Sequence, residues 1–148
     1  MTIDIQEQGF DPGRLQRSLM SASGEEGAVV TFTGHVRNDS ESRKILSMEL
    51  EHYPGMTQQS IKTILEEAQQ RWPLLRVHVV HRVGELYPGE PIVWVGVTAE
   101  HRASAFSACE FIMDYLKTRA PFWKKERTNE GDYWVDSRDS DADRAERW

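Results

Sequence analysis

Cysteine is almost absent from this sequence: Cys109 is the only one among 148 residues, so no internal disulfide bond can form. Every apolar run falls well short of the ~20 residues that a membrane-spanning helix needs. The start of the chain, MTIDIQEQGF, has neither the basic nor the apolar stretch of a secretory signal. These absences favour a protein of the reducing cytoplasm.

Sequence patterns that hold nucleotides, metals or catalytic nucleophiles are also missing. The chain contains no P-loop, no GxSxG elbow and no HxxxH pair. His78 and His81 are three residues apart on a predicted strand, which places their side chains on opposite faces. Cys109 lies on the apolar stripe of a predicted helix, which indicates a buried structural residue. We therefore expect no metal site and no bound cofactor.

The charge of the chain is negative overall but positive in one short segment. The net charge is −6, which argues against a general nucleic-acid binder. Residues 115–127 nevertheless contain five cations and one acid, Glu126, a local charge of +4 (5 − 1). These cations are Lys117, Arg119, Lys124, Lys125 and Arg127. Because like charges repel, such clustering indicates either a solvated basic turn or an anion-binding site.

Hydrophobic spacing predicts alternating strands and helices. The predicted strands cover residues 28–36, 46–53, 77–83 and 92–98, followed by a hairpin over 122–127 and 133–136. The predicted helices begin at Asp11-Pro12, at Thr57 and at 101–102, and the last two end at Pro73 and Ala120-Pro121. Gly34 is expected to mark a bulge or a close backbone approach. Residues 38–44 are expected to form a polar linker, and residues 92–98 a central strand.

Strand pairs separated by helices indicate a single α+β domain over residues 1–148. We expect two layers, with the helices packed on a mostly antiparallel or mixed sheet and an extra C-terminal hairpin. The polar, acidic tail, residues 137–148, receives no prediction of secondary structure.

Two of the predicted strands end in a histidine and an arginine. His35 and Arg37 follow the first strand, and His101 and Arg102 lie where a buried strand gives way to a helix. Exposed N–H groups and the helix dipole favour an anion at such a helix start. Together with the basic segment, these pairs predict a pocket for an anionic, phosphorylated small molecule.

Five segments carry a resemblance to a known family. They are TFTGHVRN (31–38), LEHYPGM (50–56), HRVGELYPGE (81–90), VGVTAEHR (95–102) and DYLKTRAPFWKKE (114–126). In content and order they resemble the large, catalytic subunits of molybdopterin synthases. The resemblance covers residues 27–135, whereas the variable N-terminal segment 1–26 and the tail carry little of it. It implies a fold of the α/β-hammerhead type.

The resemblance also implies a reaction and partners. Members of the family are sulfurtransferases that convert cyclic pyranopterin monophosphate to molybdopterin by inserting two sulfurs as a dithiolene. The sulfur comes from a small ubiquitin-like carrier subunit whose C-terminal Gly-Gly bears a thiocarboxylate. A homodimer of large subunits forms the core of a heterotetramer. A partner that brings the sulfur agrees with a chain whose only cysteine is expected to be buried.

Residue roles follow from the same motifs. Lys117 matches the essential lysine and is expected beside the carrier's terminal carbonyl, as a general acid/base or to polarise that carbonyl. Lys124 matches a second important lysine, for proton transfer at the pterin or stabilisation of charge. Arg37, His101 and Arg102 match positions that hold phosphate and pterin. The resemblance also implies less defined roles in substrate binding for His35, Val36, Lys125 and Glu126. Phe32 and Trp123 are expected to form walls of the pocket.

Other function classes remain open at the level of sequence. The chain could be a non-catalytic module that docks a ubiquitin-like Gly-Gly tail or a phosphorylated ligand. It could be a Schiff-base enzyme that uses Lys117 on a phosphorylated carbonyl compound without a partner. A single-strand nucleic-acid binder using Phe122 and Trp123 is the weakest alternative, because the chain is acidic.

Overall fold

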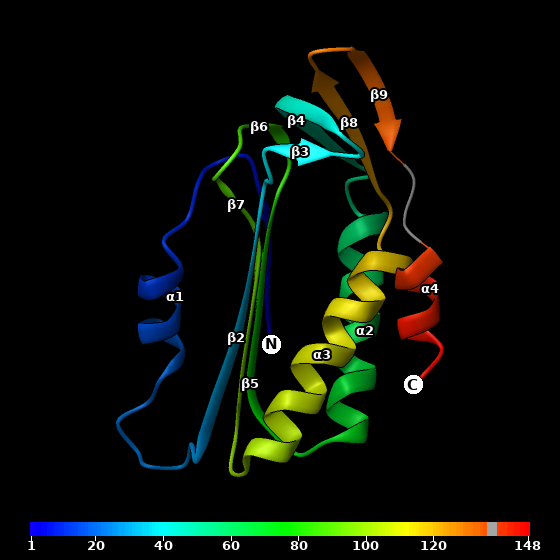
Figure 1. The fold of residues 1–148 in the computed structure, drawn as a ribbon. Coiled ribbons are helices and arrows are strands. Elements are labelled where there is room, and N and C mark those ends of the chain that lie inside the picture. Colours follow the sequence, from blue (N-terminus) through cyan, green and yellow to red (C-terminus); the bar gives the residue numbers. More distant parts are fainter. Residues whose placement is uncertain (136–138) are drawn as a thin grey trace.

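The computed structural model describes residues 1–135 and 139–148, whose strands form two sheets. In Figure 1 the first sheet runs vertically and the second lies at its upper end. The first contains β1 (Thr2–Gln6), β2 (Ala28–His35), β5 (Leu74–Arg82) and β7 (Pro91–Ala99). The second contains β3 (Asp39–Ser40), β4 (Arg43–His52), β6 (Gly84–Leu86), β8 (Phe122–Thr128) and β9 (Gly131–Val135). The helices are α1 (Pro12–Leu19), α2 (Met56–Arg71), α3 (Arg102–Thr118) and α4 (Asp139–Ala145).

The first sheet has the strand order β1-β5-β7-β2, so the apolar strand β7 is central, as predicted. β1 pairs with β5 in parallel, and the other neighbours are antiparallel. The predicted irregularity at Gly34 is confirmed, because the register of β2 against β7 shifts between Gly34 and His35. A Cβ at Gly34 would lie 2.9 Å from a methyl of Val93, so the side chain of Val93 occupies the space that a larger residue would need there.

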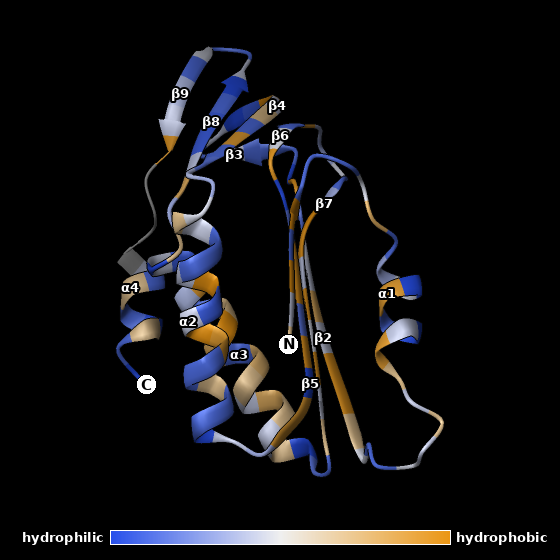
Figure 2. Cartoon of the chain, turned by 180° about the vertical axis from the view of Figure 1, so that it is seen from behind, coloured by the Kyte–Doolittle hydropathy of each residue, from blue (hydrophilic) through white to orange (hydrophobic). Residues whose placement is uncertain are grey.

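Helices cover both faces of the first sheet (Figure 1). α2 and α3 pack on one face through a core that includes Ile61, Val95 and Phe111. The short α1 lies on the other face, where Leu19 packs on Trp94. Apolar residues accordingly gather on the surfaces where helices and sheet meet (Figure 2). None of the helices in the described part of the chain has the length and apolar character needed to span a bilayer.

The second sheet has the order β3-β4-β8-β9, with β6 also on β4. The β8–β9 pair confirms the predicted C-terminal hairpin. The prediction of a linker at residues 38–44 was wrong, because β3 pairs with the start of β4. The turn between them places Glu41 and Ser42 at positive φ, 49° and 70°. β6 was missed because three residues are too few for a hydrophobic period to be recognised.

Both ends of the described chain contain structure that the sequence did not indicate. β1 extends the first sheet at its β5 edge. The unassigned tail, residues 137–148, forms α4 from Asp139 and packs beside α3 (Figure 1). Residue 136, the last of the predicted hairpin, and residues 137 and 138 of the tail lie outside the described residues.

Candidate active site

Lys117 lies in the last turn of α3, at the end of a pocket of about 400 Å³. The helix ends here because the residue before Pro121 disfavours the helical conformation. The pocket runs between α3, β2 and α4, and its walls include Phe32, Phe106, Cys109, Met113 and Arg144. Its walls are largely apolar, and its charged lining residues are two cations, Lys117 and Arg144, and three acids, Glu110, Asp114 and Asp141. Arg144 is paired with Glu110 and Asp114, so Lys117 is the cation that the pocket offers to an anionic terminus. The prediction that Phe32 forms a pocket wall is consistent with this geometry.

A stacked pair of rings joins β5 to the start of β8. His81 of β5 is buried, and its ring stacks on Phe122 with centroids 3.9 Å apart and an interplanar angle of 14°. Burial, with smaller effects of the charges of Lys117 and His52, lowers the pKa of His81 to about 4. His81 is therefore neutral at pH 7. Sequence reasoning missed this residue because its burial comes from contacts between distant strands.

β8 carries Lys124 and Glu126 on one face, two residues apart. Glu126 is 2% exposed, and its Oε2 lies 3.9 Å from Nζ of Lys124. Its other oxygen, Oε1, is buried without a hydrogen-bond partner in the described part of the chain. A buried carboxylate is stabilised by a nearby cation. We therefore interpret Glu126 as a residue that orients Lys124 rather than one exposed to a ligand.

Trp123 and Lys125 project from the opposite face of β8. The indole of Trp123 packs edge-on against Tyr53, with centroids 4.4 Å apart. Nζ of Lys125 lies 3.9 Å from Oδ2 of Asp132 and over the ring of Trp134. Neither residue lines the pocket that contains Lys117. Their predicted parts in that pocket thus find no support in the geometry of one chain.

The cations of the basic segment are divided among several partners. Arg119 forms two hydrogen bonds with the carboxylate of Glu67 on α2, 2.9 and 3.0 Å long. This bidentate ion pair joins α2 to the end of α3, so Arg119 is structural. Lys117 is the cation of the segment that lines the pocket, and Lys124 lies beside the buried carboxylate of Glu126 on β8.

His35 ends β2 at its upper end in Figure 1, and Val36 and Arg37 follow it. Val36 is buried in the core beneath the second sheet, and its backbone N–H and C=O bind Glu90 and Gly89. His35 and Arg37 are exposed on either side of it. Val36 thus anchors the segment, and the side chains of His35 and Arg37 remain accessible to a ligand.

His101 and Arg102 lie at the opposite end of α3 from Lys117 (Figure 1). Fifteen residues (117 − 102) separate Arg102 from Lys117, which at 1.5 Å per residue is about 22 Å. His101 occupies the N-cap position but makes no capping hydrogen bond with its side chain. A single chain therefore does not bring the predicted phosphate-binding pair to the Lys117 pocket.

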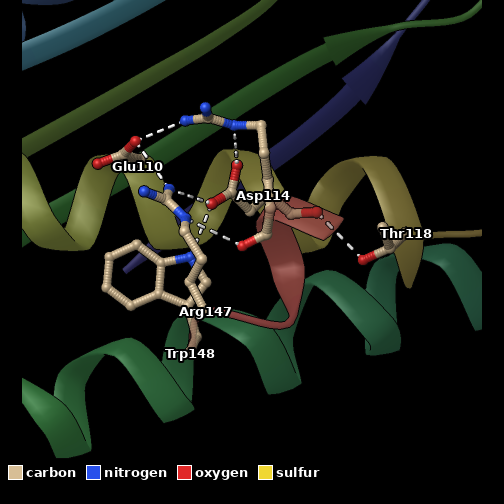
Figure 3. A network of polar contacts seen from close by, with 6 residues as sticks. Glu110, Asp114, Thr118, Arg147 and Trp148 are labelled. Carbon is tan, nitrogen blue, oxygen red and sulfur yellow. Dashed lines mark hydrogen bonds and ion pairs between the residues drawn. The ribbon is translucent and has the colours of Figure 1, made fainter. Parts of the chain in front are cut away.

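The C-terminal segment closes one side of the pocket through a polar network that sequence reasoning missed (Figure 3). Asp114 on α3 accepts hydrogen bonds from Arg144, Arg147 and Trp148, and Glu110 accepts from both arginines. The Trp148 ring packs edge-on against Trp72 and Phe111. These contacts hold α4 against α3.

Cys109 lies at the floor of the pocket, and its thiol is buried. Desolvation, with a smaller effect of Glu110, raises the pKa of Cys109 to about 12. The thiolate, the form that attacks or carries sulfur, is therefore almost unpopulated at pH 7. No group of three or more candidate metal ligands occurs in residues 1–135 and 139–148.

Comparison with known proteins assigns the chain to a family. Residues 5–119 match the family described as MoaE protein. The chain belongs to the MoaE family. It is 54% identical over 148 residues to the molybdopterin synthase catalytic subunit of Pseudomonas aeruginosa, covering 100% of this chain and 99% of that protein. The subunit of that name in Escherichia coli K12 is 61% identical over 124 residues, covering 84% and 83% of the two chains.

Solved structures of the MoaE family share the fold. The molybdopterin biosynthesis MoaE protein of Burkholderia ambifaria MC40-6 has a TM-score of 0.84 and 48% identity, over 99% of this chain and 97% of that chain. Molybdopterin synthase from Staphylococcus aureus has a TM-score of 0.82 and 30% identity, over 89% and 95%. These similarities confirm the α+β fold and the family that the five motifs indicated. The family match includes His101 and Lys117, and the Pseudomonas alignment extends over Lys124.

Proposed function

We propose that this chain is the catalytic subunit of a molybdopterin synthase, a sulfurtransferase that forms the dithiolene of molybdopterin from cyclic pyranopterin monophosphate. The observation that carries the proposal is the position of Lys117 at the end of an apolar pocket of about 400 Å³ in a chain of the MoaE family. The apolar walls suit an uncharged glycine backbone, and Lys117 can pair with an anion at its end. The partner is a small ubiquitin-like carrier whose Gly-Gly terminus bears a thiocarboxylate.

The carrier supplies the sulfur because this chain has no accessible thiolate. The thiocarboxylate sulfur attacks an oxygen-bearing carbon of the pterin precursor and forms a carbon–sulfur bond. The carbon–oxygen bond at that carbon breaks, and its oxygen leaves with the phosphate or, after protonation, as water. Water then cleaves the bond between that sulfur and the carbonyl carbon of the carrier. The sulfur stays on the pterin, the carrier leaves as a carboxylate, and a second loaded carrier delivers the second sulfur.

The two lysines have separate parts in this scheme. Lys117 polarises the carrier's terminal carbonyl and stabilises the oxyanion that forms when water attacks it. Lys124, oriented by buried Glu126, stabilises negative charge or transfers a proton at the pterin. His35 and Arg37, accessible at the end of β2, contribute to binding the pterin phosphate.

A second copy of the chain supplies His101 and Arg102 to this pocket. Within residues 1–135 and 139–148, β2 pairs with β7 alone, so its other edge is open in one chain. Phe32 and Phe106 beside that edge are 40% and 61% exposed. An apolar surface next to an open strand edge favours association with another chain.

The direction of β2 explains how a second copy completes the site. The Ala28 end of β2 pairs with Ala99, next to His101, whereas its His35 end lies at the Lys117 end of α3. If two β2 strands lie antiparallel across a two-fold axis, the Ala28 end of one meets the His35 end of the other. This arrangement brings His101 and Arg102 of one copy toward Lys117 of its partner.

The cytoplasm is the compartment that we propose for this reaction. A thiocarboxylate is readily oxidised, so its transfer requires the reducing conditions in which free thiols also persist.

The test is product formation with thiocarboxylated carrier and cyclic pyranopterin monophosphate, followed by mass spectrometry. We expect a product that has gained two sulfurs, dependent on the chain and absent with a carrier that ends in an ordinary carboxylate. A folded chain that binds the carrier tail and gives no product would instead support the docking module. Borohydride trapping of substrate on Lys117 without a carrier would support the Schiff-base alternative.

A further inference from the structure

A joint of three residues, 119–121, connects the helix that carries Lys117 to the strand that carries Lys124. α3 ends at Thr118 and β8 begins at Phe122. In the proposed reaction the two lysines act on two molecules that become bonded to each other during sulfur transfer. The relative placement of the lysines therefore depends on the path that the joint takes between helix and strand.

The backbone of the joint is bonded locally at both of its ends. The N–H of Arg119 donates to the carbonyl oxygen of Tyr115, 2.7 Å away, and the N–H of Phe122 donates to that of Ala120, 2.9 Å away. Pro121 has no N–H to donate. Its carbonyl oxygen is thus the group through which a neighbouring element can hold the backbone of Pro121.

The hydroxyl of Thr57 holds this carbonyl group. Thr57 lies in the first turn of α2, and its side chain is fully buried, with 0% exposure. Its Oγ1 donates a hydrogen bond of 3.0 Å to the carbonyl oxygen of Pro121 and accepts one of 3.1 Å from the N–H of Tyr53. Because a hydroxyl has a single proton, that proton is committed to the joint. One buried side chain therefore connects the residue after β4, the start of α2 and the joint.

A second contact between α2 and the joint is more exposed. Arg119 forms its ion pair with Glu67, and both side chains are 37% exposed. Water competes with such a pair and can replace it. Buried groups that lose a partner have no such replacement, so a lost bond costs more there. The hydrogen bond of Thr57 is therefore the contact with the stronger hold on the joint.

We propose that Thr57 is a positioning residue for sulfur transfer, an inference that rests on the proposed function. Its hydroxyl fixes the path of the joint and thereby the placement of Lys124 relative to Lys117. Thr57 lies outside the pocket that contains Lys117, so it acts through the two lysines and not on a reactant.

Replacement of Thr57 by valine removes the hydroxyl and keeps the shape of the side chain. The carbonyl group of Pro121 and the N–H of Tyr53 then lose their shared partner, and the joint shifts. We expect kcat to fall about 10-fold in Thr57→Val with little change in KM for the carrier, because a small misplacement of a catalytic group slows the reaction. Thr57→Ser retains a hydroxyl and should recover most of this loss.

The matched control is Thr128→Val. Thr128 is 6% exposed, and its hydroxyl also makes one bond of each kind. It donates to the carbonyl oxygen of Gly131 at 2.7 Å and accepts from the N–H of Glu130 at 3.1 Å, in the turn between β8 and β9. This variant loses a similar pair of bonds away from the joint and should keep the wild-type kcat. Equal kcat in Thr57→Val and Thr128→Val would overturn the proposal.

Circular dichroism checks that each variant is folded. If Thr57→Val fails to fold, Thr57→Ala replaces it, because it also removes the hydroxyl and adds no methyl group. The comparison with Thr57→Ser then stays the same. Equal kcat in Thr57→Ala and Thr57→Ser would likewise overturn the proposal.

A second readout does not depend on product. Hydrogen–deuterium exchange, followed by NMR, reports on the N–H groups of Arg119 and Phe122, which lie on either side of Pro121. We expect both to exchange faster in Thr57→Val and at the wild-type rate in Thr128→Val. Unchanged exchange in Thr57→Val would overturn the hold on the joint. A wild-type chain that yields no product would count against the proposed function, whereas faster exchange in its Thr57→Val variant would still support that hold.

Discussion

Nε1 of Trp148 donates a hydrogen bond to Oδ2 of Asp114, 2.7 Å away, and joins residue 148 to the middle of α3 (Figure 3). Asp114 is 6% exposed and also accepts from Nε of Arg144 at 3.2 Å and Nη2 of Arg147 at 3.0 Å. Arg144 in turn lines the pocket of Lys117. The carboxylate of Asp114 therefore links the stability of the C-terminal segment to the shape of the pocket.

Replacement of Asp114 by Asn should destabilise the protein. The variant removes the charge that three donors share, and hydrogen bonds to charged groups contribute about 1.5–3 kcal/mol each. Because the partners can relax toward water, we expect a total loss of about 2–3 kcal/mol in the free energy of unfolding, measured in urea. Glu110→Gln is the control, since its more exposed ion pairs should contribute less than about 1 kcal/mol. An equal loss in both variants would contradict this assignment.

The contribution of Asp114 should depend on pH. Burial opposes ionisation, but the hydrogen bonds from Trp148, Arg147 and Arg144 outweigh it, so the pKa of Asp114 lies below its ordinary value of 3.8. A carboxylate with a lowered folded-state pKa stabilises the fold above its unfolded pKa and loses this effect as the pH falls through the folded one. The difference in unfolding free energy between wild type and Asp114→Asn should thus be constant above about pH 5 and shrink in stronger acid. A difference that grows in acid would contradict the sign of this shift.

Single replacement of either lysine should abolish most turnover without unfolding the chain. We expect Lys117→Ala and Lys124→Ala to lower the rate of product formation about 10²- to 10⁴-fold, the range for lost acid–base or charge-stabilising groups. The control is Lys62→Ala, which removes an exposed ion pair with Glu66 on α2. Circular dichroism checks the fold. Full activity of folded Lys117→Ala would rule out its proposed role.

Mixing two inactive variants should restore activity if the site spans two copies. A hybrid of Lys117→Ala and Arg102→Ala subunits has one site that lacks both residues and one that retains both. Random exchange gives hybrids in half of the dimers, so we expect about a quarter of the wild-type activity. Refolding the variants together and separately provides the comparison. No recovery from verified hybrids would show that Lys117 and Arg102 act within one chain.

Cys109 should be chemically inert. With its pKa raised to about 12, the thiol should react with iodoacetamide far more slowly in the native chain than in urea, as followed by mass spectrometry. Cys109→Ser keeps the shape of the pocket floor and should keep most of the turnover. Loss of turnover in a folded Cys109→Ser protein would show that the thiol takes part in the reaction.

The sequence predicted those parts of the fold whose signals are local. The apolar run of β7 and the apolar stripe of α3 predicted that both elements contribute to the core. Ala120-Pro121 predicted the end of α3 beside Lys117. The hairpin of residues 38–44 was missed, because two-residue strands leave no hydrophobic period to recognise.

The site was harder to predict because it depends on contacts between distant segments. The sequence indicated an anion site both at His101-Arg102 and at Lys117. In the structure these residues lie at opposite ends of α3. Strand alternation indicated that His81 and His78 face opposite sides and do not share a metal. The stack of His81 on Phe122 could not be predicted, because Phe122 is placed by the pairing of β4 with β8. The anchoring of Trp148 on Asp114 likewise has no local signal in a polar tail.

The burial of Cys109 determines how the proposed enzyme behaves from one cycle to the next. An enzyme that carried the sulfur on its own cysteine would need a new sulfur atom before each turnover. It would therefore alternate between two covalent states. Here the polypeptide emerges from every cycle chemically unchanged, and only the carrier is spent. Each sulfur transfer therefore consumes one loaded carrier, and the large subunit needs no step of its own to regenerate it.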